Sequence, residues 1–236
     1  MRGISSMATR QVLAELVAAW QQRSVSAVAI ESVGGVDAAR RVQAGEPFDV
    51  VVLASDAIDK LIAGGHVVAG SKVDLVDSGV SVAVPAGAAR PDIGSEAALR
   101  RAVQAAPTIG YSTGPSGVAL LQLFERWGIA DEIRQRTVQA PPGVPVGALV
   151  ARGEVALGFQ QLSELMHLDG IDVVGPLPDA VQITTTFSAG IGAGSAQAAA
   201  VRDMLASMSS PAAAQAIRRH GMQPARTHPS APKEQK

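Results

Sequence analysis

The stretch Phe48-Asp49-Val50-Val51-Val52-Leu53 decides the fold, because it is the clearest strand in the chain. An almost continuous apolar run is typical of a strand in a parallel sheet that helices cover on both faces. On its amino-terminal side, Val36 to Ala44 has the pattern of a helix, which Gly45-Glu46-Pro47 ends. On its carboxyl-terminal side, Ser55 is predicted to cap a helix that runs to Ile62. The region therefore predicts a helix, a buried strand and a second helix in succession.

The alternation of strand-like and helix-like runs extends in both directions from this region. Arg2-Gly3-Ile4-Ser5 is predicted to be the first strand, and Thr9 to Gln22 carries apolar residues at helical spacing. Further strands are predicted at 25–30, 80–84, 108–111, 155–159, 171–174 and 182–191. Further helices are predicted at 95–105, 116–127, 146–151, 162–166, 195–207 and 211–220. This order predicts an α/β fold with parallel sheets, flanking helices and right-handed crossovers.

Composition excludes several classes of function. The 236 residues are 47% hydrophobic, which is enough for one large domain or two small ones. The 20 basic and 21 acidic residues show neither the excess nor the stripe of positive charge that nucleic-acid binding requires. The absence of cysteine excludes disulfides, thiolate metal sites and cysteine nucleophiles. The four histidines lack metal-ligand spacing, so we expect no metal site. No cofactor is predicted either.

The sequence permits two predictions of the cellular location. No window approaches the roughly 18 apolar residues that a membrane span requires, so membrane insertion is not expected. A strand predicted from Arg2 leaves no room for an export signal, and the sequence as it stands predicts a cytoplasmic protein. A periplasmic location is the alternative, if a signal has been removed ahead of Met1.

Ligands of open α/β sheets bind where strands end and helices begin, which directs attention to these turns. The turn Ile4-Ser5-Ser6-Met7-Ala8-Thr9-Arg10 offers hydroxyls, free backbone amides and a cation, a combination that suits an anion. The alternative is a purely structural role, in which Ser5 or Ser6 caps a helix and Arg10 is solvated. Ser32-Val33-Gly34-Gly35 is followed by Arg40, and its glycines allow either close ligand approach or an ordinary tight turn.

Three later turns add candidates. Tyr111 to Gly117 contains Ser112, Thr113 and Ser116 but no nucleotide-binding GxxxxGK[ST] pattern, which favours a small anion or carboxylate over a nucleotide, with a plain capped loop as the equal alternative. Pro141 to Gly147 enters a helix with bare backbone amides at Val146. Gly158-Phe159-Gln160-Gln161 places two amides at the end of an apolar strand, and Glu164 is predicted to complete the start of the next helix.

The candidate ligand-binding residues are therefore spread over five turns. Together they are Ser5, Ser6, Arg10, Gly35, Arg40, Ser112, Thr113, Ser116, Val146, Gln160 and Gln161. Neither a Gly-x-Ser-x-Gly motif nor a dinucleotide-binding fingerprint is present. The sequence identifies no catalytic base, and it leaves the oligomeric state open.

From residue 2 to residue 222 the order of these elements resembles the molybdate-type substrate-binding proteins of ABC transporters. The segments that carry the resemblance are Ile4-Ser5-Ser6, residues 40–51, residues 81–85, residues 109–112 and residues 153–159. The resemblance implies a type II periplasmic-binding-protein fold, with two lobes of mostly parallel sheet flanked by helices and a ligand cleft between them. It assigns residues 1–84 and 188–223 to lobe 1 and residues 85–187 to lobe 2. Residues 224–236 are polar and are predicted to be a disordered tail.

The chain departs from this family where the oxyanion is held. Ser6 matches the first binding serine, but the second falls at Gly34-Gly35, and Gln160-Gln161 replaces an expected tyrosine. Because such sites depend on a full set of neutral donors, a tetrahedral oxyanion is a poor fit.

Residues 158–165 and 186–191 instead resemble a divergent branch that includes aconitate isomerase. That branch implies a di- or tricarboxylate ligand, held by Arg10 or Arg40, and an enzyme that shifts a proton across an allylic C=C system. The alternative is a transport receptor for a small anion, whose partner would be an ABC permease if the protein is exported. A cytoplasmic ligand sensor ranks last, because no partner domain is attached.

Overall fold

The computed structural model describes residues 1–226. Its strands form a single mixed sheet in the order β2-β1-β3-β9-β4-β7-β5-β6, to which β8 and β10 add by pairing with β4. The strands are β1 (Arg2–Ser6), β2 (Ala29–Val33), β3 (Val50–Ala54), β4 (Val73–Pro85), β5 (Ile109–Tyr111), β6 (Thr137–Gln139), β7 (Leu157–Gln161), β8 (Ile171–Pro176), β9 (Thr184–Ile191) and β10 (Met222–Pro224).

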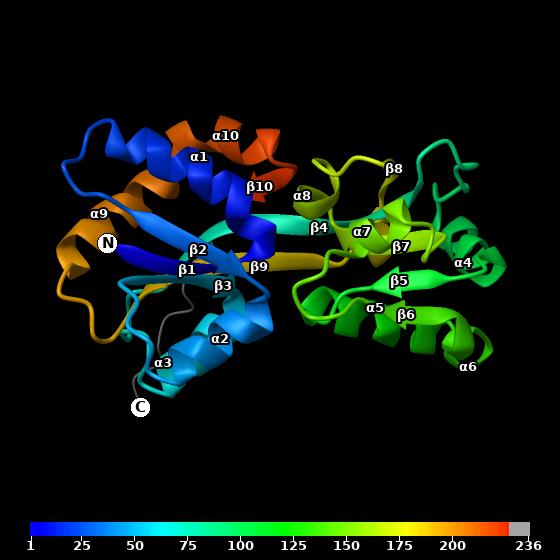
Figure 1. The fold of residues 1–236 in the computed structure, drawn as a ribbon, viewed down its shortest axis with the longest axis horizontal. Helices are drawn as coiled ribbons and strands as arrows, with labels where there is room; N and C mark the ends of the chain where they lie inside the picture. Colours follow the sequence, from blue (N-terminus) through cyan, green and yellow to red (C-terminus); the bar gives the residue numbers. More distant parts are fainter. Residues whose placement is uncertain (227–236) are drawn as a thin grey trace, which may run out of the picture.

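The helices cover both faces of this sheet. Figure 1 shows α1 and α10 on one face of the β1–β2–β3 ladder, and α2 and α3 on the other. The α-helices are α1 (Arg10–Gln21), α2 (Gly35–Gln43), α3 (Ser55–Ala63), α4 (Glu96–Ala105), α5 (Pro115–Arg126), α6 (Ala130–Ile133), α7 (Val146–Ala151), α8 (Leu162–Leu165), α9 (Ala198–Met208) and α10 (Ala214–Arg219). Short 3-10 turns are η1 (Met7–Thr9), η2 (Arg134–Arg136), η3 (Asp179–Val181) and η4 (Pro211–Ala213).

The apolar run of β3 behaves as its sequence predicts. Val50 and Val52 pack into a core that includes α1 and α9, whereas Val51 and Leu53 pack into a second core with α2 and α3. Successive side chains of a strand point to opposite faces, so a strand covered on both sides must be apolar at every position. This explains why β3 could be recognised from the sequence alone.

The long strand β4 contributes to cores at both ends of the molecule. Leu75 and Val76 join the core that α1 and α9 cover, whereas Val80, Val82 and Val84 join a separate core built with α4 and α5. Figure 1 shows the corresponding two groups of elements, with β4 and β9 running between them. These two strands pair side by side in antiparallel orientation, and Ser78 pairs with Thr185 where both strands pass from one group of elements to the other.

The expectation of mostly parallel sheets is wrong. Parallel pairs occur in β1–β2, β1–β3, β5–β6 and β5–β7, but β4 pairs antiparallel with β7, β8, β9 and β10, and β3 pairs antiparallel with β9. A strand that crosses between two groups of elements and a strand that returns must run in opposite directions. Asp74, Asp77 and Gly79 interrupt the apolar pattern of β4, so the sequence predicted only its residues 80–84.

Several local expectations also need correction. The strand expected at 25–30 lies at Ala29–Val33, and Val25 is fully exposed. Ala54, not Ser55, occupies the N-cap position of α3. Pro224, expected in a disordered tail, pairs with Val76 in β10, and residues 227–236 lie outside the described residues. Within residues 1–226, no helix combines the length and apolar character needed to cross a membrane.

Candidate functional site

A cavity of about 400 Å³ lies where β1, β3 and β7 end and their helices begin. One wall is formed by Ser6, Gly35, Arg40 and neighbouring residues of η1, α2 and α3, and the opposite wall by the segments 112–116 and 140–145. Thr185 and Phe187 of β9, with Gln160, Gln161 and Glu164, complete the lining. A concave site of this volume at the carboxyl ends of strands is the usual place for a small ligand in an α/β protein.

The first wall combines helix N-termini with two cations. Gly35 lies beside Ser6, and a Cβ atom on it would be in ordinary van der Waals contact with the Ser6 Oγ, at 3.6 Å. Arg40 and Lys60 are largely exposed, and each pairs with a carboxylate of its own helix, at 3.3 Å and 3.6 Å. Backbone amides at helix N-termini and two loosely paired cations together favour a negatively charged ligand.

The second wall is rich in hydroxyls. The Oγ atoms of Ser112 and Ser116 lie 3.2 Å apart, and α5 begins between them at Pro115. Gly117 is required here, because a Cβ atom would stand 1.9 Å from the carbonyl oxygen of Ser112. The glycine therefore lets the first turn of α5, which carries Ser116, fold directly against the loop that holds Ser112 and Thr113.

Two buried glutamines with different settings lie at the end of β7. The Oε1 of Gln160 accepts a hydrogen bond from the Gly147 amide at 3.1 Å, and its Nε2 donates to Glu164 at 3.0 Å. The Nε2 of Gln161 donates to Thr185 at 3.0 Å, and within the described residues its buried Oε1 has no hydrogen-bond partner. Gln160 is therefore held at both ends, whereas Gln161 keeps one polar atom for a further contact.

Glu164 has an unusual setting for a carboxyl group. It is partly buried in the first turn of α8 and lines the cavity, and the described residues supply no cation beside it. Burial raises the pKa of Glu164 to about 7, although the hydrogen bond from Gln160 opposes the shift by stabilising the charged form. The sequence assigned Glu164 only to a helix start. Its position four residues after a buried glutamine, across a strand-to-helix turn, is the signal that could have found it.

The structure brings together eight of the predicted residues at this cavity. Those eight are Ser6, Gly35, Arg40, Ser112, Thr113, Ser116, Gln160 and Gln161. Ser5, Arg10 and Val146 are not among its lining residues. Ser5 is fully buried, and its Oγ lies 2.8 Å from the Ser32 Oγ. Arg10 is exposed at the start of α1. Val146, the first residue of α7, is buried in an apolar cluster with Leu149 and Val150 of the same helix.

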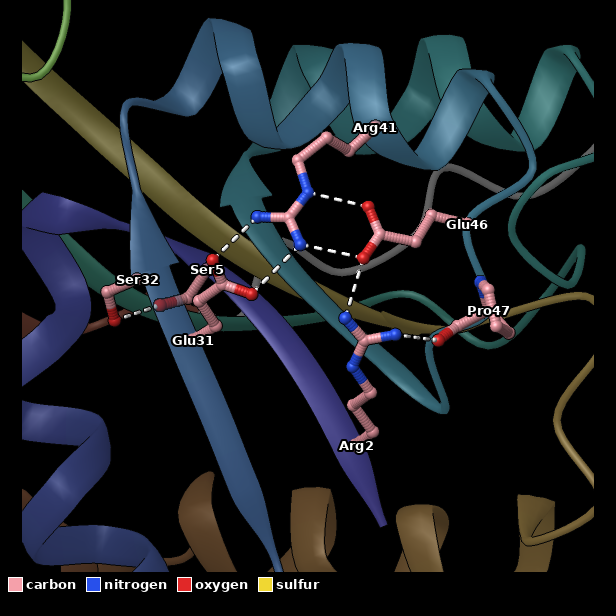
Figure 2. A network of polar contacts seen from close by, with 7 residues as sticks. All are labelled: Arg2, Ser5, Glu31, Ser32, Arg41, Glu46 and Pro47. Atoms are coloured by element: carbon pink, nitrogen blue, oxygen red, sulfur yellow. Dashed lines mark hydrogen bonds and ion pairs between the residues drawn. The ribbon is translucent and has the colours of Figure 1, made fainter.

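The neighbouring arginines Arg40 and Arg41 have separate surroundings. Figure 2 shows the Arg41 guanidinium between Glu31 and Glu46, to which it donates hydrogen bonds of 2.6–2.9 Å, with Arg2 also donating to Glu46. This network ties α2 to β1 and β2 and holds the pKa of Glu46 down to about 2. Arg41 is absent from the cavity lining, so Arg40 is the member of the pair that can meet a ligand.

The mixed α/β fold and the cavity at its strand ends define a protein of the periplasmic-binding-protein type. The family model of bacterial extracellular solute-binding proteins matches residues 2–223, and the chain belongs to that family. It is 41% identical over 190 residues to an aconitate isomerase of a Pseudomonas species, which covers 80% of this chain and 72% of that protein. The resemblance predicted from the sequence is thus confirmed.

Solved structures agree with this fold. The periplasmic molybdate-binding protein of Azotobacter vinelandii matches with a TM-score of 0.77 at 21% identity, over 94% of this chain and 98% of that one. The sulfate-binding protein SubI of Mycobacterium tuberculosis matches with a TM-score of 0.74 at 14% identity, over 95% and 86% of the two chains. At these identities the likeness concerns the fold.

Proposed function

We propose that this protein is an isomerase that binds a small di- or tricarboxylate in the cavity and moves its C=C bond, as an aconitate isomerase does. The observation that carries the proposal is the 41% identity to the Pseudomonas aconitate isomerase, which extends over most of both chains. The structural relatives that bind molybdate or sulfate are far less similar in sequence, at 21% and 14%.

The lining of the cavity supports a polycarboxylate ligand. Arg40 and Lys60 lie on one wall and the hydroxyls of Ser112, Thr113 and Ser116 on the other, so carboxylates at two ends of a ligand can be bound at once. Ser6, Gly35 and Gln161 complete the proposed ligand-binding set, and Gln160, whose amide is engaged by Gly147 and Glu164, borders the ligand. Arg40 is favoured over Arg10 as the carboxylate-binding arginine, because Arg10 is not among the lining residues.

We further propose that the two walls belong to two lobes that close on the ligand. Lobe 1 comprises residues 1–84 and 188–223, and lobe 2 comprises residues 85–187. The separation of the hydrophobic cores on either side of Ser78 in β4 supports a division into two lobes, although Val80, Val82 and Val84 pack with the second core, ahead of the boundary at residue 84. The only covalent links between these lobes are the continuations of β4 and β9, which would act as the hinge.

A transport receptor for a small anion is the second candidate. Membership of the extracellular solute-binding family favours it. In that case the partner would be an ABC permease and the location periplasmic, whereas the isomerase proposal is compatible with the cytoplasm.

Thermal denaturation with added ligands separates the two candidates, because a ligand that binds only the native state raises the melting temperature. The ligands are cis-aconitate, trans-aconitate, molybdate and sulfate. Stabilisation by an aconitate, followed by interconversion of the isomers in ¹H NMR spectra, is the expected result. Stabilisation by molybdate or sulfate alone would reject the isomerase and favour the receptor.

A further inference from the structure

The reaction proposed above needs a group that both takes and gives a proton, and the cavity offers few choices. The titratable residues that line it are Arg40, Asp56, Lys60 and Glu164. Asp56 and Lys60 pair with each other, and Arg40 pairs with Asp37, all on exposed surfaces of α2 and α3. Glu164 lies at the other end of the lining, partly buried and next to the two glutamines.

We propose that Glu164 is the catalytic carboxyl that removes and returns the migrating proton, and that Gln160 is the positioning residue that holds it. This inference rests on the proposed isomerase function. The hydrogen bond from Gln160 leaves one oxygen of Glu164 occupied and the other available to the ligand. The backbone N–H of Gly147 donates a hydrogen bond to the Gln160 Oε1. This bond fixes the orientation of the Gln160 side-chain amide, so the Gln160 Nε2 must face Glu164.

The proposed reaction is a balanced proton shift. The Glu164 carboxylate takes a proton from a methylene carbon of the ligand, so a C–H bond breaks and an O–H bond forms. The electron pair left on carbon spreads over the neighbouring C=C bond to its far carbon and the attached carboxylate. Glu164 then gives the proton to that far carbon, which shifts the double bond by one position and restores the carboxylate. No oxidant, reductant or water is consumed.

The surroundings of Glu164 suit a group that works in both protonation states near neutral pH. α8 packs against β4, β7 and η1, and β7 and η1 carry no charged residue. On the neighbouring elements, β4 carries Asp74 and Asp77, which accept hydrogen bonds from Ser188 and Thr186, and His167 follows α8 and meets the His220 ring edge-on. Arg40, Asp56 and Lys60 line the same cavity. A carboxyl whose pKa lies near 7 is half ionised there, as a general acid–base catalyst requires.

Replacing Glu164 by Gln tests the inference directly. For the E164Q variant we expect kcat for aconitate isomerisation to fall at least about 100-fold, the usual contribution of a general base. We expect binding of trans-aconitate, measured by the shift in melting temperature, to be retained, because the variant loses a negative charge rather than a ligand-binding group. E125Q, at an exposed position of α5, is the matched control and should turn over like the wild type.

The test of Gln160 uses the pH profile. The rise of kcat/KM with pH should centre near pH 7 in the wild type and move to higher pH in Q160L, which loses the hydrogen bond that favours the carboxylate. A purely structural Gln160 would lower kcat without moving this midpoint. If E164Q does not fold, E164D serves instead, and its displaced carboxyl should lower kcat while ligand binding persists.

The outcomes separate this inference from the proposed function. A wild type that binds aconitate but never isomerises it would overturn both. A wild type that isomerises it, with E164Q equally active, would overturn only the assignment of Glu164. Loss of turnover in D56N with E164Q unaffected would transfer the role to Asp56 and would likewise overturn this inference.

Discussion

At the scale of single residues, Glu164 shows how burial of a functional group costs stability. Its pKa is raised from 4.5 to about 7, so between these values the folded protein holds a proton that the unfolded chain has released. The free energy of unfolding must therefore fall as pH rises from about 4.5 to about 7. The carboxyl would not keep such a position for the sake of stability, which agrees with a role in catalysis.

The E164Q variant should accordingly be more stable than the wild type at pH 8. We expect a gain of about 2 kcal/mol in the free energy of unfolding, after allowance for the partial exposure of the carboxyl. At pH 4 both states of the wild type hold the proton, and the two proteins should differ little. Urea denaturation at both pH values measures this, and equal differences at the two would contradict the raised pKa.

Arg40 should contribute to ligand binding in a way that Arg100 does not. Substitution R40Q removes a cation from the cavity wall, and we expect Kd for aconitate to rise roughly 10-fold, since charge-assisted hydrogen bonds at exposed sites contribute about 1–2 kcal/mol. R100Q, an exposed change on α4 outside the lining, is the matched control. Calorimetric titration measures both. An unchanged affinity in R40Q would remove Arg40 from the proposed set.

At the scale of elements, the start of α5 depends on a single close contact. A methyl group at Gly117 would meet the Ser112 carbonyl oxygen, so G117A must displace the loop or the helix. We expect a loss of about 1–3 kcal/mol in the free energy of unfolding, as for other overpacked sites. At Gly114, the N-cap of the same helix, an added Cβ has room, and G114A should cost less. Urea denaturation compares the two variants, and an equal loss would contradict the contact.

At the scale of the whole molecule, the proposed hinge predicts a change of shape. If β4 and β9 let two lobes close on a ligand, the radius of gyration measured by small-angle X-ray scattering should decrease when trans-aconitate is added. The E164Q variant, which keeps the binding groups, should close in the same way, whereas addition of sodium chloride at equal ionic strength should not cause closure. An unchanged radius with saturating ligand would contradict the hinge.

An element could be predicted from the sequence when residues close to it in the chain determine its structure. β3 and the helices α1, α2 and α5 were predicted within a few residues, because their apolar spacing is local, and glycine or proline also marks the boundaries of α2 and α5. β6 and β10, three residues each, and the first half of β4 were not, because long-range pairing stabilises them. The antiparallel course of β4 and β9 likewise depends on contacts between distant parts of the chain.

The sequence by itself determined the α/β class, the family and the five turns that could bind a ligand. These features could be predicted because strand ends and hydroxyl-rich or glycine-rich turns depend on a few consecutive residues. Only the tertiary structure decided which turns meet: Ser6, Gly35 and Arg40 come to face Ser112 and Gln160, whereas Ser5 and Val146 turn into buried contacts. It also singled out Glu164, because the pKa of a carboxyl depends on its burial and neighbours, and these exist only once the chain has folded.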